Sequence, residues 1–509
     1  MALPSVSDPS SQPPSFKKRQ FEDAAAAVAY ARNIYEANIC YLQDNCQRLV
    51  DGGPIPRAVS ANYPYVALTI GKQDLRSSDI DTRASYGFVT RAGRHMTTIT
   101  RPDIFATYLS EQLRVLRENH RVPIEVGVSR SPIPLKFAYG NGVNPEGTFA
   151  PAAARRLQDA FDHPDLGRMG SDFGQGNRAA PENCYPLSLF SAPRVDLSLQ
   201  RLKHYTGTDP ADFQRFVLFT NYDFYIRDFR DVARKILSRT SDPEQHAYRS
   251  DYTRFVEPGG YTSYNANLGE RRPQGERQKR TPQMPAYHLV REDGNGITLV
   301  NIGVGPSNAK TITDHIAVLR PHAWIMVGHC AGLSPTLEKG GYVLGHAYLR
   351  KDHILDDLLP LHVPVPNLAE VQQALIGAVK KVTGREATDL DKVLRTGTVA
   401  TFADRNWEFD GFGRFQKELE QSNAVAIDME SGTIAANGYR YRVPYGTLLC
   451  VSDRPLHGDL KLPGMASSFY DQQTSAHLQV AMIAMEMLRE DTRFLHSRKM
   501  TPYVGRPFL

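Results

Sequence analysis

Residues 297–319 read ITLVNIGVGPSNAKTITDHIAVL, and residues 323–333 read AWIMVGHCAGL. The first stretch passes from the apolar run Ile297–Val304 into the helical periodicity of Ala309–Leu319, and the second opens with another apolar run, Ala323–Val327. Apolar runs that alternate with amphipathic helices indicate parallel strands buried between layers of helix. This part of the chain therefore predicts an α/β fold.

The same alternation continues on both sides of this stretch. Strands are expected at Phe216–Thr220, Lys339–Ala347, Arg395–Thr401, Ala424–Ile427 and Tyr445–Val451, and helices at Tyr225–Leu237 and Thr474–Leu488. A polar insertion at residues 238–284 interrupts the pattern, and its composition favours a solvated loop over a binding patch. The expected fold is α/β, a mostly parallel or mixed sheet flanked by helices, and it covers residues 195–509.

The first two hundred residues follow a different pattern. A long amphipathic helix is expected from Phe21 to Leu49, before the sequence DGGP at residues 51–54. Short strands are expected after it at Tyr63–Ile70, Tyr86–Thr90, Thr97–Thr100 and Pro123–Val128. One further helix is expected at Ile104–Arg117. Residues 140–186 are rich in Gly, Pro, Asn and Asp and predict a long loop. We expect a smaller α+β domain at residues 21–194, preceded by a disordered tail at residues 1–20.

The composition is that of a soluble globular protein, with 41% hydrophobic and 23% charged residues. No apolar run approaches the ~20 residues that cross a bilayer, and Pro and Ser occupy the place where a signal peptide is apolar. We therefore expect a cytoplasmic protein without membrane contact. The five cysteines lack metal-ligand spacing, so no metal site is expected, and a net charge of +5 is too small to indicate nucleic acid.

Two strand ends carry small residues where a ligand can approach the backbone. The turn GVGPSNAK at residues 303–310 joins a strand to a helix, so backbone N–H groups at Gly305 and Ser307 can face an anion or sugar hydroxyls. In GHCAGL at residues 328–333, Gly328 permits close approach and His329 stands at the carboxyl end of its strand, where open α/β sheets bind ligands. Read alone, the first motif is also compatible with an ordinary tight turn, and His329 in the second is also compatible with a structural histidine.

Two further strands deliver carboxylates to the same edge. They are AIDMES at residues 426–431, which supplies Glu430, and CVSDRP at residues 450–455, which supplies Asp453. Either motif read alone fits a helix N-cap as well as a catalytic group.

Taken together, the order and spacing of these motifs resemble the purine nucleoside phosphorylase and nucleosidase superfamily. The resemblance implies that Met429 and Glu430 hold the ribose and that Asp453 protonates the departing purine. An ionised Glu430 would also stabilise the positive charge that develops on the sugar. Arg454 would oppose protonation of Asp453 if it pointed inward, so we expect it to turn away and pair with another carboxylate.

The chain departs from the phosphorylase pattern at the phosphate site. Phosphorylases of this superfamily present a Gly-Asp-Pro turn, an Arg and a Ser to phosphate, whereas this chain has Asn221 in the sequence TNY (220–222), then Met326 and His329. Without charge-assisted donors, free phosphate is a poor nucleophile here, and water is favoured. The departure therefore selects a nucleosidase over a phosphorylase.

The whole chain resembles the bacterial AMP nucleosidase family. The resemblance is carried by RLKHYTGT at 201–208, YGTLLCVSDRPLHGDLKLPG at 445–464 and LHSRK at 495–499, as well as by the N-terminal domain. It implies hydrolysis of AMP to adenine and ribose 5-phosphate without a cofactor for the chemistry. It also implies a homo-oligomer, a hexamer, with MgATP as activator and phosphate as inhibitor. The N-terminal domain, which has no evident chemical task, is then expected to be regulatory.

The remaining substrate contacts are predicted from ATFADRNWE at residues 400–408. Relatives place residues equivalent to Asn406 and Trp407 against the purine, although Trp407 is as well explained as a core residue. Arg405 is the candidate for the 5′-phosphate, with Lys310, Arg227 and the basic residues of the insertion at 238–284 as alternatives.

Two other functions remain open from the sequence. A purine nucleoside phosphorylase or nucleosidase acting on unphosphorylated substrates would use the same two carboxylates and would lack a 5′-phosphate pocket. A nucleotide-sensing protein without catalysis would bind AMP and release no adenine.

Overall fold

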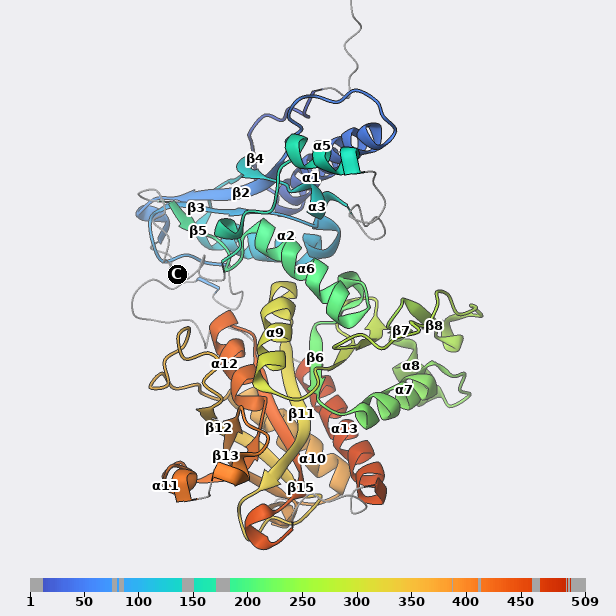
Figure 1. Ribbon diagram of the computed structural model, residues 1–509, viewed down its shortest axis with the longest axis vertical. Helices are drawn as coiled ribbons and strands as arrows, with labels where there is room; N and C mark the ends of the chain where they lie inside the picture. Colours follow the sequence, from blue (N-terminus) through green and yellow to red (C-terminus); the bar gives the residue numbers. More distant parts are fainter. Residues whose placement is uncertain are drawn as a thin grey trace, which may run out of the picture. The chain divides into compact units, whose positions relative to one another are not determined.

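The computed structural model describes residues 12–75, 80–81, 87–139, 151–170, 184–386, 388–410, 413–459, 467–490, 492 and 495 (Figure 1). The chain divides into two compact units between Gln200 and Arg201, inside helix α6 (Ala192–Thr206). Unit 1 precedes this point, and unit 2 runs from Arg201 to Met500.

Unit 1 is an α+β domain with one sheet of five strands, in the order β1-β4-β2-β3-β5. Its strands are β1 (Arg19–Phe21), β2 (Asn62–Ile70), β3 (Gly93–Thr98), β4 (Ile124–Pro132) and β5 (Cys184–Pro186). The pairings are antiparallel except for that of β3 with β5. Its helices are α1 (Ala24–Val50), α2 (Pro102–His120), α3 (Leu135–Ala138), α5 (Pro151–Ala160) and the first part of α6.

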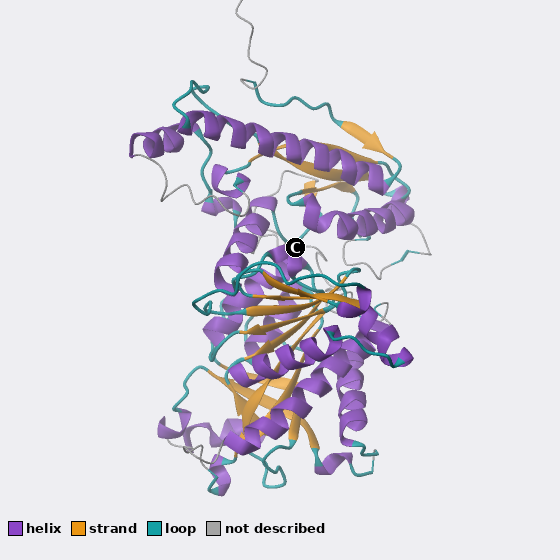
Figure 2. Cartoon of the chain, turned by 90° about the vertical axis from the view of Figure 1, so that its right-hand side faces the viewer, coloured by secondary structure: helices purple, strands orange, loops and turns teal. Residues whose placement is uncertain are grey.

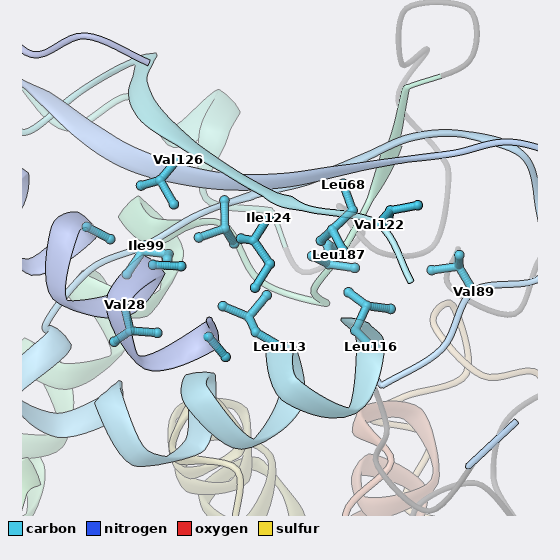
Figure 3. Close-up of a cluster of buried hydrophobic side chains, with 14 of the residues drawn as sticks. Val28, Leu68, Val89, Ile99, Leu113, Leu116, Val122, Ile124, Val126 and Leu187 are labelled. Carbon is cyan, nitrogen blue, oxygen red and sulfur yellow. The ribbon is translucent and has the colours of Figure 1, made fainter. Parts of the chain in front are cut away.

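The long helix α1 forms where the sequence predicts it. Asp23 caps its start by accepting a hydrogen bond from the backbone N–H of Ala26 at 2.8 Å. Figure 3 shows how Val28 of this helix and Leu113 of α2 face Ile124 on the sheet. Burial of each such side chain stabilises the fold by about 1.5–3 kcal/mol, which holds both helices on the sheet.

Three expectations for unit 1 need correction or fall outside the described residues. The tail expected at residues 1–20 is too long, because Arg19 and Gln20 pair with β4; residues 1–11 lie outside the described part. The loop expected at 140–186 contains α5 and β5, although 140–150 and 171–183 are not described. Of the strand expected at Tyr86–Thr90, Tyr86 is not described and residues 87–90 form no strand.

Unit 2 is built on a sheet of ten strands, in the order β14-β13-β12-β15-β11-β6-β10-β9-β7-β8. The strands are β6 (Phe216–Thr220), β7 (Tyr252–Glu257), β8 (Tyr261–Tyr264), β9 (Ala286–Arg291), β10 (Ile297–Asn301), β11 (Ala323–Gly332), β12 (Tyr342–Lys351), β13 (Leu394–Phe402), β14 (Ala424–Asp428) and β15 (Tyr445–Asp453). Parallel and antiparallel pairs occur together. The expected α/β fold with a mixed sheet is confirmed.

Helices lie on either side of these strands (Figure 2). They are α7 (Asp223–Leu237), α8 (Pro243–Ser250), α9 (Pro306–Ile316), α10 (Ala369–Thr383), α11 (Gly413–Gln421), α12 (Ser431–Tyr441) and α13 (Ser467–Glu490). One group packs α13 against α7 and α10, and another packs α9 against α12. The continuous apolar run of β11 is explained by this covering, since nearly all its side chains are buried.

The insertion at residues 238–284 is not the simple loop that its composition predicts. It contains α8, β7 and β8, and β7 pairs with β9. Phe255 and Val256 of β7 are buried, whereas residues 270–280 are exposed. The prediction failed because β9, one of the two strands that pair with β7, lies outside the insertion, so the polarity of the insertion does not reveal this pairing.

Candidate active site

The sheet of unit 2 closes partly on itself, and this closure brings strand ends together. Besides the pairings along the sheet, the end of β11 pairs with β14, so that Ala331 lies opposite Ile427. Ala331 is also the register partner of Asp453 at the end of β15. The two strands that carry the predicted carboxylates therefore end beside the same residue.

Glu430 is held at this edge by two hydrogen bonds. Its Oε1 accepts from the backbone N–H of Gly305 at 2.6 Å, and its Oε2 accepts from Nδ2 of Asn221 at 3.1 Å. The side chain is almost completely buried. Gly305 precedes the first turn of α9 with φ = 116°, a conformation that favours glycine. Three residues predicted from separate motifs are thus brought together.

Asp428 is a site residue to which the sequence analysis gave no role. Its Oδ1 accepts from the Thr401 hydroxyl at 2.7 Å, and its Oδ2 accepts from the backbone N–H of Ser431 at 2.9 Å, at the start of α12. Burial raises the pKa of Asp428, and burial together with the charge of Asp428 raises the pKa of Glu430. The pair therefore resists carrying two negative charges at once, and a cation that develops beside it would favour the ionised form of Glu430. The sequence contained a signal for this residue, because Asp428 is a second carboxylate at the end of a strand, two positions before Glu430.

Asp453 ends β15 and is mostly buried. It accepts a hydrogen bond from the hydroxyl of the preceding Ser452. Arg454 turns to Asp459 instead, with Nε and Nη2 at 2.9 and 2.7 Å from its Oδ2, and also donates to the carbonyl of Leu337. The prediction that Arg454 pairs with another carboxylate is confirmed, and its charge is directed away from the proposed acid.

Gly328 and His329 lie near the end of β11. A Cβ at Gly328 would meet Met326 Cε at 2.7 Å and Asn221 Oδ1 at 3.1 Å, so a larger residue here would require the side chains of Met326 and Asn221 to shift. His329 is buried, and its ring centroid lies 5.0 Å from that of Tyr222, the residue after Asn221. Both residues therefore belong to the surroundings of the amide that binds Glu430.

The residues predicted to bind the base differ in their exposure. Met429 is half-buried, next to Glu430. Trp407 is buried in a hydrophobic cluster with its ring 6.0 Å from that of Phe402, which is the environment of a core residue. Arg405 and Asn406 are exposed in the turn before Trp407.

The alternatives for the 5′-phosphate are engaged in ion pairs. Lys310 Nζ lies 2.6 Å from Asp314 Oδ2, and Arg227 Nε lies 3.5 Å from Asp228 Oδ1. Ser307, in the first turn of α9, is exposed. Glu430 already accepts from the N–H of Gly305, so it is the N–H groups of the first turn of α9, such as that of Ser307, that remain suited to an anion at the positive end of the helix dipole.

Within the described residues, no group of three or more His, Cys, Asp or Glu side chains is placed to hold a metal ion. Among the helices that the structure describes, none is long and apolar enough to cross a membrane.

Known proteins resemble both units of the chain. Residues 26–183 match the family described as "Bacterial AMP nucleoside phosphorylase N-terminus", and residues 268–489 match the "Phosphorylase superfamily". The AMP nucleosidases of Escherichia coli strain K12 and of Escherichia coli O157:H7 are each 44% identical over 478 residues, which cover 93% of this chain and 96% of each relative. A solved structure, that of AMP nucleosidase from Bacteroides thetaiotaomicron VPI-5482, matches with 26% identity and a TM-score of 0.41 over 58% of this chain and 98% of that chain.

Proposed function

The chain belongs to the AMP nucleosidase family, and we propose on this basis that it hydrolyses the N-glycosidic bond of AMP to adenine and ribose 5-phosphate. The observation that carries the proposal is the buried Glu430, bound by Gly305 and Asn221 at the strand edge where Asp453 also lies. The chemistry needs two groups of this kind, one for the sugar and one for the base.

The two carboxylates would act on opposite partners of the breaking bond. As the bond from C1′ to N9 lengthens, positive charge develops on the ribose and negative charge on adenine, as in other glycoside cleavages. Glu430 would accept hydrogen bonds from the ribose hydroxyls and stabilise the cationic sugar. Asp453 would donate a proton to N7 of adenine, which is favourable because Arg454 is occupied by Asp459.

Water is the proposed nucleophile. The methyl group of Met326 lies close to Gly328, in the part of β11 where phosphorylases present a charged donor to phosphate. An apolar thioether offers no charge-assisted hydrogen bond to a dianion, so binding of free phosphate is disfavoured. This supports hydrolysis over phosphorolysis.

Several properties stay proposals that rest on the family. They are activation by MgATP, inhibition by phosphate, assembly into a hexamer, a cytoplasmic location and a regulatory role for unit 1. Arg405 and the N–H groups at the start of α9 are the proposed contacts of the 5′-phosphate, and Asn406 and Trp407 those of the base.

The test is product analysis by chromatography after incubation with AMP in phosphate-free buffer. Adenine and ribose 5-phosphate should form in equal amounts, and adenosine in a parallel incubation should react much more slowly. Ribose 1,5-bisphosphate as the main product after addition of phosphate would identify a phosphorylase. Equal rates with adenosine would favour the unphosphorylated substrates, and AMP binding without adenine release would favour a sensor.

A further inference from the structure

Asp428 and Glu430 stand two positions apart, where β14 ends and α12 begins. Their Cα atoms lie at most about 7 Å apart, because even an extended chain advances by no more than about 3.6 Å per residue. Both side chains are almost completely buried. Two negative charges this close repel more strongly in the protein interior than in water, so the pair favours a state with one proton. The hydrogen bonds around each carboxyl group indicate which of the two carries it.

The surroundings of Asp428 favour its ionised form. Its Oδ2 accepts from the N–H of Ser431 at 2.9 Å, and its Oδ1 accepts from the hydroxyl of Thr401 at 2.7 Å. Thr401 Oγ1 itself accepts from the N–H of Gly432 at 2.8 Å, and within the described residues Asp428 is the acceptor of its hydroxyl hydrogen. A protonated Asp428 would place its own hydrogen against these donors and leave a buried donor unpaired, which is costly. Asp428 therefore keeps its negative charge.

The surroundings of Glu430 accommodate either form. Gly305 N–H and Asn221 Nδ2 donate to the ionised carboxylate. Asn221 Oδ1 is buried and has no hydrogen-bond partner in the part of the chain that the structure describes. A half-turn of this amide exchanges Nδ2 and Oδ1, and the oxygen then accepts a hydrogen bond from a protonated Glu430. Glu430 can thus take up the proton of the pair and still donate its hydrogen to an acceptor.

The electrostatics agree with this assignment. Burial, followed by the charge of Asp428, raises the pKa of Glu430 to about 8. Burial also raises the pKa of Asp428, but the hydrogen bonds from Ser431 and Thr401 oppose that effect. In the free protein at neutral pH the proton of the pair therefore lies on Glu430.

The elements packed against α12 carry other ionisable side chains. They are Lys310 and Asp314 on α9, His329 on β11, Arg350 on β12, Asp352 after that strand, Arg395 on β13 and Asp453 on β15. Burial and the charge of Asp428 raise the pKa of Glu430 more than any of these groups does. Asp428 is therefore the charge to which the proton on Glu430 responds most.

We propose that Asp428 is a positioning residue that stays ionised and thereby sets the pH at which Glu430 loses its proton and becomes able to stabilise the cationic sugar. This inference rests on the proposed hydrolysis of AMP, in which the ionised Glu430 faces the ribose. The form of Glu430 that has lost its proton to solvent is the one that reacts. The charge of Asp428 keeps this form in the minority below about pH 8, until positive charge on the sugar favours it.

A matched pair of substitutions separates the charge of Asp428 from its contacts. Asp428→Asn keeps an oxygen for the N–H of Ser431 and turns its NH2 group toward Thr401 Oγ1, which can accept, so it removes the charge and keeps the contacts. Asp352→Asn removes another buried carboxylate that binds α12, through the hydroxyl of Thr433. Both variants carry the same chemical change, and Asp428→Asn alone removes the charge that acts most on the proposed sugar-binding carboxylate.

The first measurement is the dependence of kcat/KM for AMP on pH in phosphate-free buffer. We expect the acid limb of the profile to move down by about one pH unit or more in Asp428→Asn, a tenfold or larger change in proton affinity, and to stay in place in Asp352→Asn. The position of the limb is the readout, because a purely structural defect at α12 lowers the rate without moving it. An unmoved limb in Asp428→Asn, or equal shifts in both variants, would overturn the proposal.

Thermal unfolding midpoints establish that each variant is folded. If Asp428→Asn does not fold, Thr401→Val takes its place, with Thr401→Ser as its control. Loss of the hydroxyl weakens the ionised form of Asp428 and should move the acid limb down, whereas Thr401→Ser keeps the hydroxyl and should leave the limb unchanged. Equal limbs in these two variants would contradict the proposal.

Infrared difference spectra between pH 6 and pH 10 locate the proton without turnover. The parent should lose a band of a protonated carboxyl group as the pH rises, the band should be absent from Glu430→Gln, and its midpoint should be lower in Asp428→Asn. A parent without this band, or a band that persists in Glu430→Gln and disappears in Asp428→Asn, would refute the assignment of the proton to Glu430. A parent that shows the expected band and does not hydrolyse AMP would refute the proposed function and leave the effect of Asp428 on Glu430 supported.

Discussion

The carboxylate of Glu430 and the backbone amide of Gly305 meet at 2.6 Å, although 125 positions separate them in the chain. The amide stands at the start of α9 and the carboxylate at the start of α12, so the contact joins two helix starts. The positive end of a helix dipole favours a negative group, which partly offsets the cost of burying Glu430.

Glu430→Gln should lose most of its turnover. The amide keeps the shape of the carboxylate but cannot supply negative charge to the cationic sugar, and losses for such electrostatic groups run to about 10²–10³-fold in kcat. The measurement is the initial rate of adenine release at saturating AMP. The exposed Glu292 provides a matched control, because Glu292→Gln makes the same chemical change outside the site. If both variants have similar rates, Glu430 does not act on the sugar.

Asp453→Asn should bind AMP and release adenine slowly. An amide cannot donate the same proton to N7, and a general acid contributes roughly 10²–10⁴-fold to the rate. The prediction is checked by kcat together with AMP binding measured by calorimetry, with Asp391→Asn at an exposed position as control. Turnover within a few-fold of the parent would exclude Asp453 as the acid.

The buried rings of His288 and His477 should destabilise unit 2 as the pH falls below neutrality. Burial lowers the pKa of His288 and of His477 to about 3, whereas an unfolded histidine titrates near 6.5. The unfolded state therefore binds more protons, and the stability that both rings contribute is present above about pH 6.5 and declines as the pH falls toward about 3. Between pH 7 and pH 5 each ring should lower the free energy of unfolding by about 2 kcal/mol.

The two tryptophans, Trp324 and Trp407, both lie in unit 2, so their fluorescence during urea unfolding reports on this unit. His477→Gln should flatten the pH dependence, and His362→Gln should not, because that ring is exposed. The same pH dependence in the parent and in His477→Gln would contradict the prediction.

Residues 192–509, which keep α6 whole, should hydrolyse AMP without activation by MgATP. The proposed reason is that nucleotide binding to unit 1 shifts unit 2 toward a more active state, and allosteric couplings are typically about 1–3 kcal/mol, or about 5- to 150-fold. The measurement is the rate against MgATP concentration, in parallel with the full chain and after folding is checked by tryptophan fluorescence. Full activation without unit 1 would place the activator site in unit 2.

The sequence predicted the strands whose own residues form a continuous apolar run. The apolar run Phe216–Thr220 and the run that begins at Ala323 became β6 and β11 because central strands are apolar on both faces. The strand Tyr252–Glu257 was missed because only three of its six residues are apolar and it lies inside a polar segment. Its burial comes from β9, which the local sequence does not reveal.

The site was predictable to the extent that its residues stand at strand ends. This rule found Glu430, Asp453, Gly305 and His329, and the charge argument placed Arg454 correctly. It gave Asp428 no role, because its partner Thr401 lies 27 positions away and only the pairing of β13 with β14 brings the two together. For Trp407 the sequence left a contact with the purine and a core position equally open, and the structure places the ring in a hydrophobic core cluster.

The pairing of β14 with β11 turns five strands of unit 2 into a closed circuit, β14-β13-β12-β15-β11. Hydrogen bonds between strands hold this circuit together, and Leu361 is exposed in the connection between β12 and α10. A protease that cut the chain beside Leu361 would leave two fragments, one with Gly305 and Asn221 and the other with Glu430 and Asp453. Each fragment would keep strands that complete the circuit of the other. The active site would then be formed by residues of both fragments, so two separate polypeptides could restore it by complementation.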